Sequence, residues 1–123
     1  NAYSWLDVNE EDIITNVSVK DFTGDNPLDK HAIIGTMFFR NKDIYTGPLS
    51  QLYQKNHRTN GEFYIDNLLN EAIDLGYIVR NFEVDKYICW GTPTDLQTYK
   101  YWQNFFDTAD WHPYEYAKDY LTN

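Results

Sequence analysis

Hydrophobic and polar residues alternate near the start of the chain as they do in β-strands. Residues 3–8 and 13–19 form two alternating runs, and the polar residues 9–12 separate them. A period of two places the apolar side chains on one face of a strand, so these runs predict a β-hairpin. The compact apolar run 31–39 predicts a third, buried strand. Gly35 interrupts this run and indicates a bulge or a close backbone approach.

Farther along, apolar residues recur at helical spacing. Residues 43–55 and 62–75 are predicted helices, and Gly76 is the residue type that commonly follows a helix end. The apolar, β-rich run 77–88 predicts a further strand. Strands and helices thus alternate after a β-rich beginning. We predict a single α/β domain over residues 1–123, with a mixed sheet flanked by helices.

The last predicted helix has a clear start signal. Thr92 is a favourable N-cap, Pro93 suits the first helical position and Asp95 falls in the first turn. Its apolar face is Leu96, Tyr99, Trp102, Phe105 and Phe106. A final short helix is predicted near Pro113.

The charge balance narrows the classes of partner. The chain has 19 Asp and Glu against 10 Lys and Arg. An acidic surface repels phosphate backbones and anionic lipid, so we expect neither nucleic acid nor a membrane surface as partner. Cys89 is the only cysteine, which rules out an intrachain disulfide and favours a cytoplasmic location. Asn1 and Ala2 are interpreted as a tag remnant.

Polar residues around the start of the predicted helix 62–75 are the first candidate site. If residues 62–71 are helical, Glu62, Asp66 and Asn70 lie on one side of the helix, where they could bind sugar hydroxyls. Gly61 permits a tight turn and a close approach of ligand to the backbone. The alternative is an ordinary solvated helix face.

Three further positions bear on ligand binding. Arg58 beside a helix start is a plausible place for a phosphate, although Glu62 competes for the same N–H donors and favours a hydroxyl-binding role. Lys20 ends a β-rich run and could reach a phosphate as a mobile point charge, the alternative being a surface lysine. His57 is interpreted as a solvated loop histidine. The three histidines are too far apart in sequence to predict a zinc site.

Aromatic residues are abundant, with 11 Tyr, 7 Phe and 4 Trp. Most are expected in packing, because each ring buries a large area. A rival hypothesis assigns some of them to a non-catalytic carbohydrate-binding or oligomerisation module. Its contact surface would be Tyr99, Trp102, Trp111, Tyr114 and Tyr116.

Five motifs in order resemble the C-terminal half of sugar-1-phosphate nucleotidyltransferases, a family that includes glucose-1-phosphate thymidylyltransferases. The resemblance runs to about Phe106. Its motifs are 3–5 (Tyr-Ser-Trp), 17–21 (Val-Ser-Val-Lys-Asp), 33–39, 60–66 with 70–73, and 91–96.

The resemblance implies a fold, an activity and partners. The fold would be a Rossmann-like α/β/α sandwich. The whole enzyme would use Mg²⁺ to transfer a nucleotidyl group from a nucleoside triphosphate to a sugar 1-phosphate, with release of pyrophosphate. The family's glycine-rich triphosphate loop lies in its N-terminal half, and no such loop occurs in this chain. We therefore expect the chain to be the sugar-phosphate-binding portion, inactive alone and compatible with a homo-oligomer.

Residue by residue, the resemblance assigns contacts to the sugar phosphate. Lys20 matches a phosphate-contacting lysine, and Gly35 matches a strand glycine beside the sugar. Glu62 matches the Glu of a Gly-Glu motif that begins at Gly61, and Asp66 matches a polar residue near the sugar.

Three positions depart from the family's pattern. Val19 stands where a sugar-contacting Glu is usual. Asn60 stands where many members have a phosphate-binding Arg, for which Arg58 is a candidate substitute. Cys89 stands where many members have a metal-binding Asp. Asp85 is a candidate replacement metal ligand, and a different ligand is an equal alternative.

Overall fold

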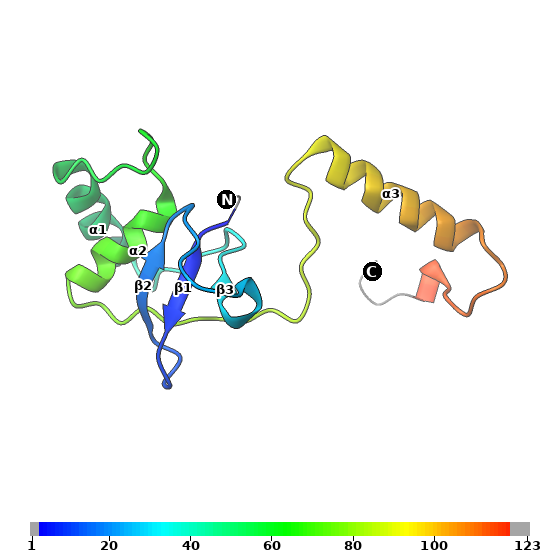
Figure 1. Cartoon of the computed structure of the whole chain (residues 1–123), viewed down its shortest axis with the longest axis horizontal. Coiled ribbons are helices and arrows are strands. Elements are labelled where there is room, and N and C mark those ends of the chain that lie inside the picture. Colours follow the sequence, from blue (N-terminus) through cyan, green and yellow to red (C-terminus); the bar gives the residue numbers. More distant parts are fainter. Residues whose placement is uncertain (1–2, 119–123) are drawn as a thin grey trace. The chain divides into compact units, whose positions relative to one another are not determined.

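A computed structural model describes residues 3–118 of the chain and shows a mixed α/β protein (Figure 1). The strands are β1 (Trp5–Val8), β2 (Ile14–Ser18) and β3 (His31–Ala32), in the sheet order β2-β1-β3. The α-helices are α1 (Lys42–Gln54), α2 (Ile65–Asp74) and α3 (Pro93–Thr108). The tag interpretation of residues 1–2 lies outside the described residues.

The α/β class is thereby confirmed at the level of its elements. Both strand pairings among the described residues are antiparallel, whereas the sequence predicted a mixed sheet. The Rossmann-like sandwich stays a prediction. No helix of residues 3–118 combines the length and apolar character needed to cross a bilayer.

The chain divides into two compact units, residues 1–83 and 84–123. The first holds the sheet, α1 and α2, and the second holds α3. Each unit is described by itself below.

The hairpin of β1 and β2 forms as predicted, because its alternation places apolar residues on one face. Leu6 pairs with Val17, and both side chains are buried. At the turn, the Asn9 side chain accepts hydrogen bonds from the N–H groups of Glu11 and Ile13, both at 3.0 Å. Asn thus substitutes for a backbone turn, a common role of this residue.

The third strand is much shorter than the predicted run 31–39. Only His31 and Ala32 pair with β1, and the Ile33 N–H then donates to the Ser4 carbonyl at 2.9 Å. Gly35 has φ +93°, which turns the backbone out of the extended conformation. The predicted strand was therefore wrong beyond its first residues.

Helix α1 begins at the N-cap Asn41, whose side chain accepts from the N–H groups of Asp43 and Ile44. Pro48 lies inside the helix and is buried. The helix ends at Gln54 with Lys55 as its C-cap, and Asn56 after the cap has a left-handed φ of 50°. The prediction of a helix over 43–55 is confirmed within a residue.

Helix α2 starts at Ile65, three residues later than predicted, so Glu62 precedes the helix. Its end follows the prediction. Gly76 has φ +82° and donates to the Ile73 carbonyl, while Tyr77 donates to the Ala72 carbonyl. This pair of bonds is a Schellman motif.

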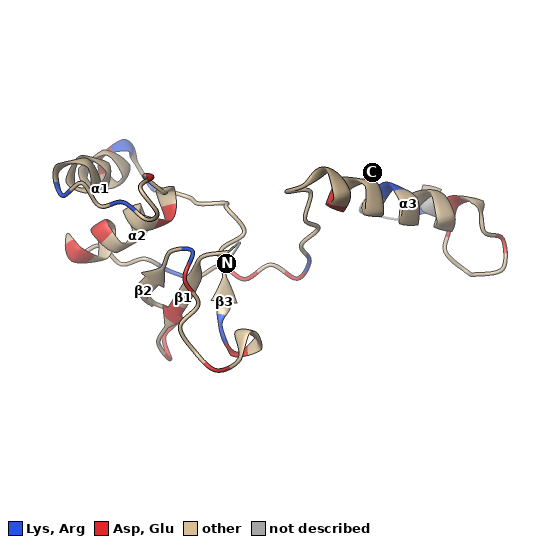
Figure 2. Ribbon diagram, turned by 45° about the horizontal axis from the view of Figure 1, so that its top comes forward, with Lys and Arg blue, Asp and Glu red and all other residues tan. Residues whose placement is uncertain are grey.

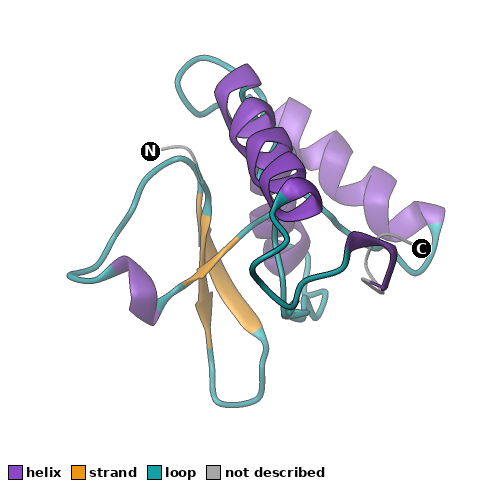
Figure 3. Ribbon diagram, turned by 90° about the vertical axis from the view of Figure 1, so that its right-hand side faces the viewer, coloured by secondary structure: helices purple, strands orange, loops and turns teal. Residues whose placement is uncertain are grey.

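The core of the first unit lies between α2 and the sheet. Helix α2 packs against β2 and also against α1. Figure 3 distinguishes the strands from the helices and loops by colour. The buried cluster consists of Leu6, Ile14, Val17, Val19 and Leu69.

The predicted strand 77–88 was wrong. The segment touches the start of β2 only briefly: Arg80 forms an isolated bridge with Ile13, and the Ile14 N–H donates to the Val79 carbonyl at 2.8 Å. Ile78 and Phe82 remain exposed. The apolar, β-branched composition of this segment predicted a strand. The segment pairs with its neighbour over too few residues to form one.

The second unit is built around α3, whose start was predicted correctly. Thr92 and Asp95 form a capping box, in which each side chain bonds the backbone N–H of the other. After α3 the chain turns back, and Phe106 lies 5.1 Å from His112 and 5.4 Å from Tyr114 between ring centroids. The helix predicted near Pro113 is a 3-10 turn, Tyr116–Lys118.

Candidate functional site

A tight turn carries three of the residues singled out from the sequence. Thr59 and Glu62 exchange both backbone hydrogen bonds, at 2.9 and 3.0 Å. Between them Asn60 has φ 51° and Gly61 has φ 83°. Positive φ at both central positions defines a type I′ turn, for which Asn-Gly is the preferred pair. The sequence Asn60-Gly61 therefore explains why Glu62 is displayed at the exposed end of a turn.

Arg58 stabilises this turn through hydrogen bonds. Its Nε donates to the Asn56 side chain and its Nη1 donates to the Gly61 carbonyl, both at 2.8 Å. The guanidinium also stacks over Phe63, 3.9 Å from the ring centroid. A guanidinium has five N–H donors, so these bonds do not use all of them. Arg58 thus supports the turn and retains donor capacity for an anion.

Glu62 and Lys20 meet at Tyr64. The Tyr64 hydroxyl donates to the Glu62 carboxylate at 3.0 Å, and this bond raises the pKa of Tyr64 above its ordinary value. The Lys20 ammonium lies over the Tyr64 ring, 5.5 Å from its centroid. A cation and a carboxylate from distant parts of the sequence are thereby brought to one aromatic ring.

A buried serine joins Lys20 to Asp66. The Ser4 side chain is 1% exposed. Its hydroxyl donates to the Asp66 carboxylate and accepts from the Lys20 N–H at 3.4 Å. Lys20 has φ 57°, a conformation that non-glycine residues rarely adopt. Such outliers are found preferentially where the surrounding structure holds a functional residue in place.

These residues converge at one end of the sheet. Ser4 immediately precedes β1, Lys20 closely follows β2, and Ile33 follows β3. The Ile33 N–H bonds the Ser4 carbonyl, which brings the segment leading to Gly35 beside them. A side chain at Gly35 would meet no atom within 4 Å, so the space next to its backbone is open.

Two residues of the predicted sugar-binding row, Asp66 and Asn70, form hydrogen bonds to other groups of the protein. Asn70 donates to the Val17 carbonyl and accepts from the Val17 N–H, both at 2.8 Å, and so ties α2 to β2. Its predicted place in a sugar-binding row is not supported. Asp66 uses one oxygen on Ser4. The predicted row of Glu62, Asp66 and Asn70 on one helix does not exist, because the helix starts after Glu62.

His57 is a loop histidine with a 39% exposed side chain, as the sequence suggested in part, but it is also bound to the protein. Its Nδ1 lies 2.7 Å from the carboxylate of Glu71, which is buried. Lys55 pairs with the other oxygen of Glu71, also at 2.7 Å. Bonds to Asp74 and then to Glu71 raise the pKa of Lys55.

The candidate metal ligand Asp85 belongs to the second unit and is exposed. Near Cys89, the Asp95 carboxylate accepts from the Thr92 N–H and hydroxyl, at 3.0 and 2.8 Å, and so serves the helix cap. Residues 3–118 contain no group of three or more His, Cys, Asp or Glu side chains placed to hold a metal ion.

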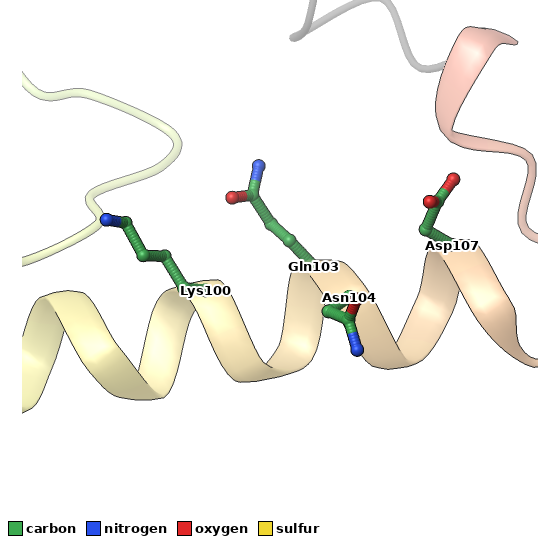
Figure 4. Close-up of a pocket in the computed structure, with 4 residues that line it drawn as sticks. All are labelled: Lys100, Gln103, Asn104 and Asp107. Atoms are coloured by element: carbon green, nitrogen blue, oxygen red, sulfur yellow. The ribbon is translucent and has the colours of Figure 1, made fainter.

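Charge is not concentrated at one place among residues 3–118. Acidic residues are spread over the hairpin, the loops, α2 and α3 (Figure 2). In the second unit, one open depression lies along α3. It is lined by Lys100, Gln103, Asn104 and Asp107, and Lys100, Gln103 and Asp107 project from the same side of the helix (Figure 4). Side chains from a single exposed helix face enclose little volume, so this depression is a weak candidate.

Comparisons with protein-family models, with curated proteins and with solved structures found no match for this chain. The resemblance to sugar nucleotidyltransferases therefore rests on the motifs of the sequence.

Reasoning from the sequence missed Ser4, Tyr64 and the pair formed by His57 and Glu71. Ser4 and Asp66 are 62 positions apart, and nothing local marks them as partners. Tyr64 lies inside the motif 60–66, but the sequence does not show its contacts. In the structure Tyr64 precedes α2 and contacts both Lys20 and Glu62.

Proposed function

We propose that this chain forms the sugar-phosphate side of the active site of a cytoplasmic sugar nucleotidyltransferase. The supporting observation is the convergence of Lys20, Glu62 and Asp66 through Ser4 and Tyr64 at one end of the sheet. A cation can pair with the phosphate of a phosphorylated sugar, and carboxylates can accept hydrogen bonds from its hydroxyls. The Rossmann-like sandwich expected from the sequence belongs to the same proposal, which is also compatible with a homo-oligomer.

Each group has a distinct role in this proposal. The Lys20 ammonium neutralises the phosphate of the sugar 1-phosphate as a point charge. The Glu62 carboxylate accepts hydrogen bonds from sugar hydroxyls, and the exposed Asn60-Gly61 turn lets the ligand approach the backbone. The remaining donors of Arg58 bind a phosphate oxygen in place of the arginine usual at position 60.

The reaction itself needs groups from outside these residues. A phosphate oxygen of the sugar 1-phosphate attacks the α-phosphorus of the nucleoside triphosphate, the bond to the β-phosphate oxygen breaks, and pyrophosphate leaves. Positioning and charge neutralisation drive such a transfer, and no residue of this chain is expected to form a covalent intermediate. The chain alone should release no pyrophosphate, and measurable release would contradict this division of roles.

Isothermal titration calorimetry with α-D-glucose 1-phosphate tests the binding role. Lys20→Ala should weaken binding about tenfold or more, because a hydrogen bond to a charged group contributes roughly 1.5–3 kcal/mol. Glu62→Gln should weaken it by a smaller factor, because the amide retains an acceptor oxygen. The matched control is Lys100→Ala, which removes an exposed lysine from α3 in the second unit and should leave the affinity unchanged.

Equal affinities for the wild type, Lys20→Ala and Lys100→Ala would contradict the proposal, as would the absence of any heat with the wild type. Glucose without phosphate should bind more weakly than glucose 1-phosphate, because Lys20 then has no anion to pair with.

A second candidate function is self-association through the second unit. Its observation is the exposure of large aromatic side chains, such as Trp111 at 75% and Trp90 at 58%. Exposed apolar clusters commonly mark interaction sites. Size-exclusion chromatography separates the candidates: a dimer that Trp102→Ala and Trp111→Ala dissociate, and that ignores sugar phosphates, would favour self-association over the binding role.

A further inference from the structure

The loop that carries the candidate site is fastened to α2 at three points. Lys55 and His57 both pair with Glu71, and Thr59 accepts a hydrogen bond from the Asn67 side chain at 3.0 Å. Glu71 and Asn67 lie one helical turn apart, so they face the loop from the same side of α2. The fastened residues alternate along the loop and end at the Asn60-Gly61 turn.

The helix groups in these contacts are buried. Glu71 is 1% exposed and Asn67 is 2% exposed. A carboxylate so buried is destabilising unless it is paired. Here Oε1 is hydrogen-bonded to His57 Nδ1 at 2.7 Å, and Oε2 forms an ion pair with Lys55 Nζ at 2.7 Å without a hydrogen bond between them. A buried Leu or Met at position 71 would fill similar space without that requirement. A glutamate at position 71 is explained if its contacts hold the loop in place.

The contacts also determine how the loop presents its ligand-facing residues. Thr59 is one partner in the two backbone bonds of the turn, and the other partner is Glu62. A shift of Thr59 would therefore move Glu62 and would loosen the Gly61 carbonyl that Arg58 holds. The Glu71 carboxylate lies 2.7 Å from His57 Nδ1, and an ionised carboxylate at this place favours a proton on Nδ1.

We propose that Glu71 and Asn67 are positioning residues, which hold loop 55–62 on α2 so that Arg58 and Glu62 keep the geometry needed to bind a sugar phosphate. This inference rests on the proposed function for the identity of the ligand. The holding of the loop itself can be measured without any ligand.

The first measurement is amide hydrogen exchange by NMR on the full chain. Asn67→Ala should speed exchange at Thr59 and Glu62 by roughly 2- to 10-fold, the range that corresponds to one net hydrogen bond. Glu71→Ala should act in the same direction, and Glu71→Gln should be milder because its amide oxygen still accepts from His57. The Ile14 amide, which bonds Val79, should keep its wild-type rate and shows that the fold is intact.

The matched control is Asp74→Asn. Asp74 lies on the same helix and also pairs with Lys55, at 2.7 Å, but it is exposed and contacts neither His57 nor Thr59 in the described hydrogen bonds. This variant should leave exchange at Thr59 and Glu62 as it is in the wild type. If Glu71→Ala does not fold, Thr59→Val tests the same fastening by removing the acceptor of the Asn67 bond without unpairing a buried charge.

The second measurement distinguishes positioning from general support of α2. The imidazole ¹⁵N shifts of His57 should report the Nδ1–H tautomer in the wild type and in Glu71→Gln, and lose it in Glu71→Ala. In parallel, the dissociation constant for α-D-glucose 1-phosphate should rise roughly 2- to 10-fold in Asn67→Ala and stay constant in Asp74→Asn.

The two proposals can fail separately. If the wild type does not bind glucose 1-phosphate, the proposed function fails, while the exchange rates still decide whether Glu71 and Asn67 hold the loop. Wild-type exchange at Thr59 and Glu62 in folded Asn67→Ala and Glu71→Gln would overturn the inference. An unchanged affinity in Asn67→Ala despite faster exchange would overturn its link to the ligand.

Discussion

The two units of this chain are stabilised in different ways. All the hydrophobic core residues found among residues 3–118 lie in the first unit, where α2 covers the sheet. In the second unit no side chain of the described residues is buried, and α3 is stabilised by its capping box and by contacts between partly exposed rings. Binding groups need a rigid support, and among residues 3–118 the buried cluster of the first unit provides one.

The comparison also shows what aromatic content means in this chain. Tyr, Trp and Phe are abundant in both units, yet the buried cluster of the first unit consists of aliphatic residues. The rings of the second unit meet one another at its surface, as Trp102 and Phe106 do at 6.0 Å. Abundant aromatics therefore do not by themselves indicate a core.

Removal of a core side chain gives the largest expected contrast. Leu69→Ala should lower the free energy of unfolding of the first unit by about 2–5 kcal/mol, since it leaves a cavity beneath α2. Trp102→Ala removes a half-exposed ring and should cost less than about 1 kcal/mol. Urea denaturation followed by NMR of each unit measures both, and equal losses would remove the distinction between the units.

Replacement by alanine at two glycines of the first unit should change the free energy of unfolding in opposite directions. Gly61→Ala forces alanine to φ +83° and should cost about 1–2 kcal/mol, although its Cβ meets no atom within 4 Å. Gly47 lies within α1 and its Cβ would make an ordinary contact with Leu75 at 3.9 Å. Gly47→Ala should therefore stabilise by about 0.5–1 kcal/mol. Thermal denaturation measures both, and equal signs would contradict the assigned turn.

The helix cap of the second unit is the next test. Thr92→Ala removes the side chain that accepts from the Asp95 N–H and should cost α3 about 1 kcal/mol. Amide exchange along α3 should become faster, while exchange in the hairpin stays constant. A simultaneous change in the hairpin would show that the units do not unfold independently.

The smallest expected effect is the pH dependence of stability that Asp7 in β1 produces. Hydrogen bonds from Lys30 and then Asn16 lower the pKa of Asp7. Because the folded pKa is lowered, the stabilisation is complete above an unfolded pKa of about 3.9 and is lost as the pH falls through the folded value. The Asp7 side chain is 37% exposed, so its share should be less than about 1 kcal/mol. Lys30→Gln should reduce this pH dependence, and an unchanged profile in acid denaturation would contradict it.

Much of the first unit could be predicted because its signals are local. Alternation predicted the hairpin, and helical spacing with Gly76 predicted α2 and its end. The failures at 33–39 and 77–88 have different local causes. Gly35 turns the backbone out of the extended conformation, and the segment 77–88 pairs only near Ile13 and Ile14. Apolar composition shows that a segment can pair as a strand, but it does not show how far the pairing extends.

Some residues of the candidate site were named from the sequence, but the contacts between them were not predicted. Lys20 and Glu62 were identified from the motif resemblance, and the structure places both at Tyr64. The bond between Ser4 and Asp66 and the bond between His57 and Glu71 depend on tertiary packing, which one sequence does not encode in any short pattern. The expected metal role of Asp85 stays a prediction.

Residue-resolved NMR titration of ¹⁵N-labelled protein with α-D-glucose 1-phosphate tests the central claim most directly. Saturable shift changes should centre on Lys20, Gly35, Glu62 and Asp66, and amides of residues 93–108 should keep their positions. Shifts confined to α3, or no saturable shift in the first unit at millimolar ligand, would contradict a sugar-phosphate site at this end of the sheet.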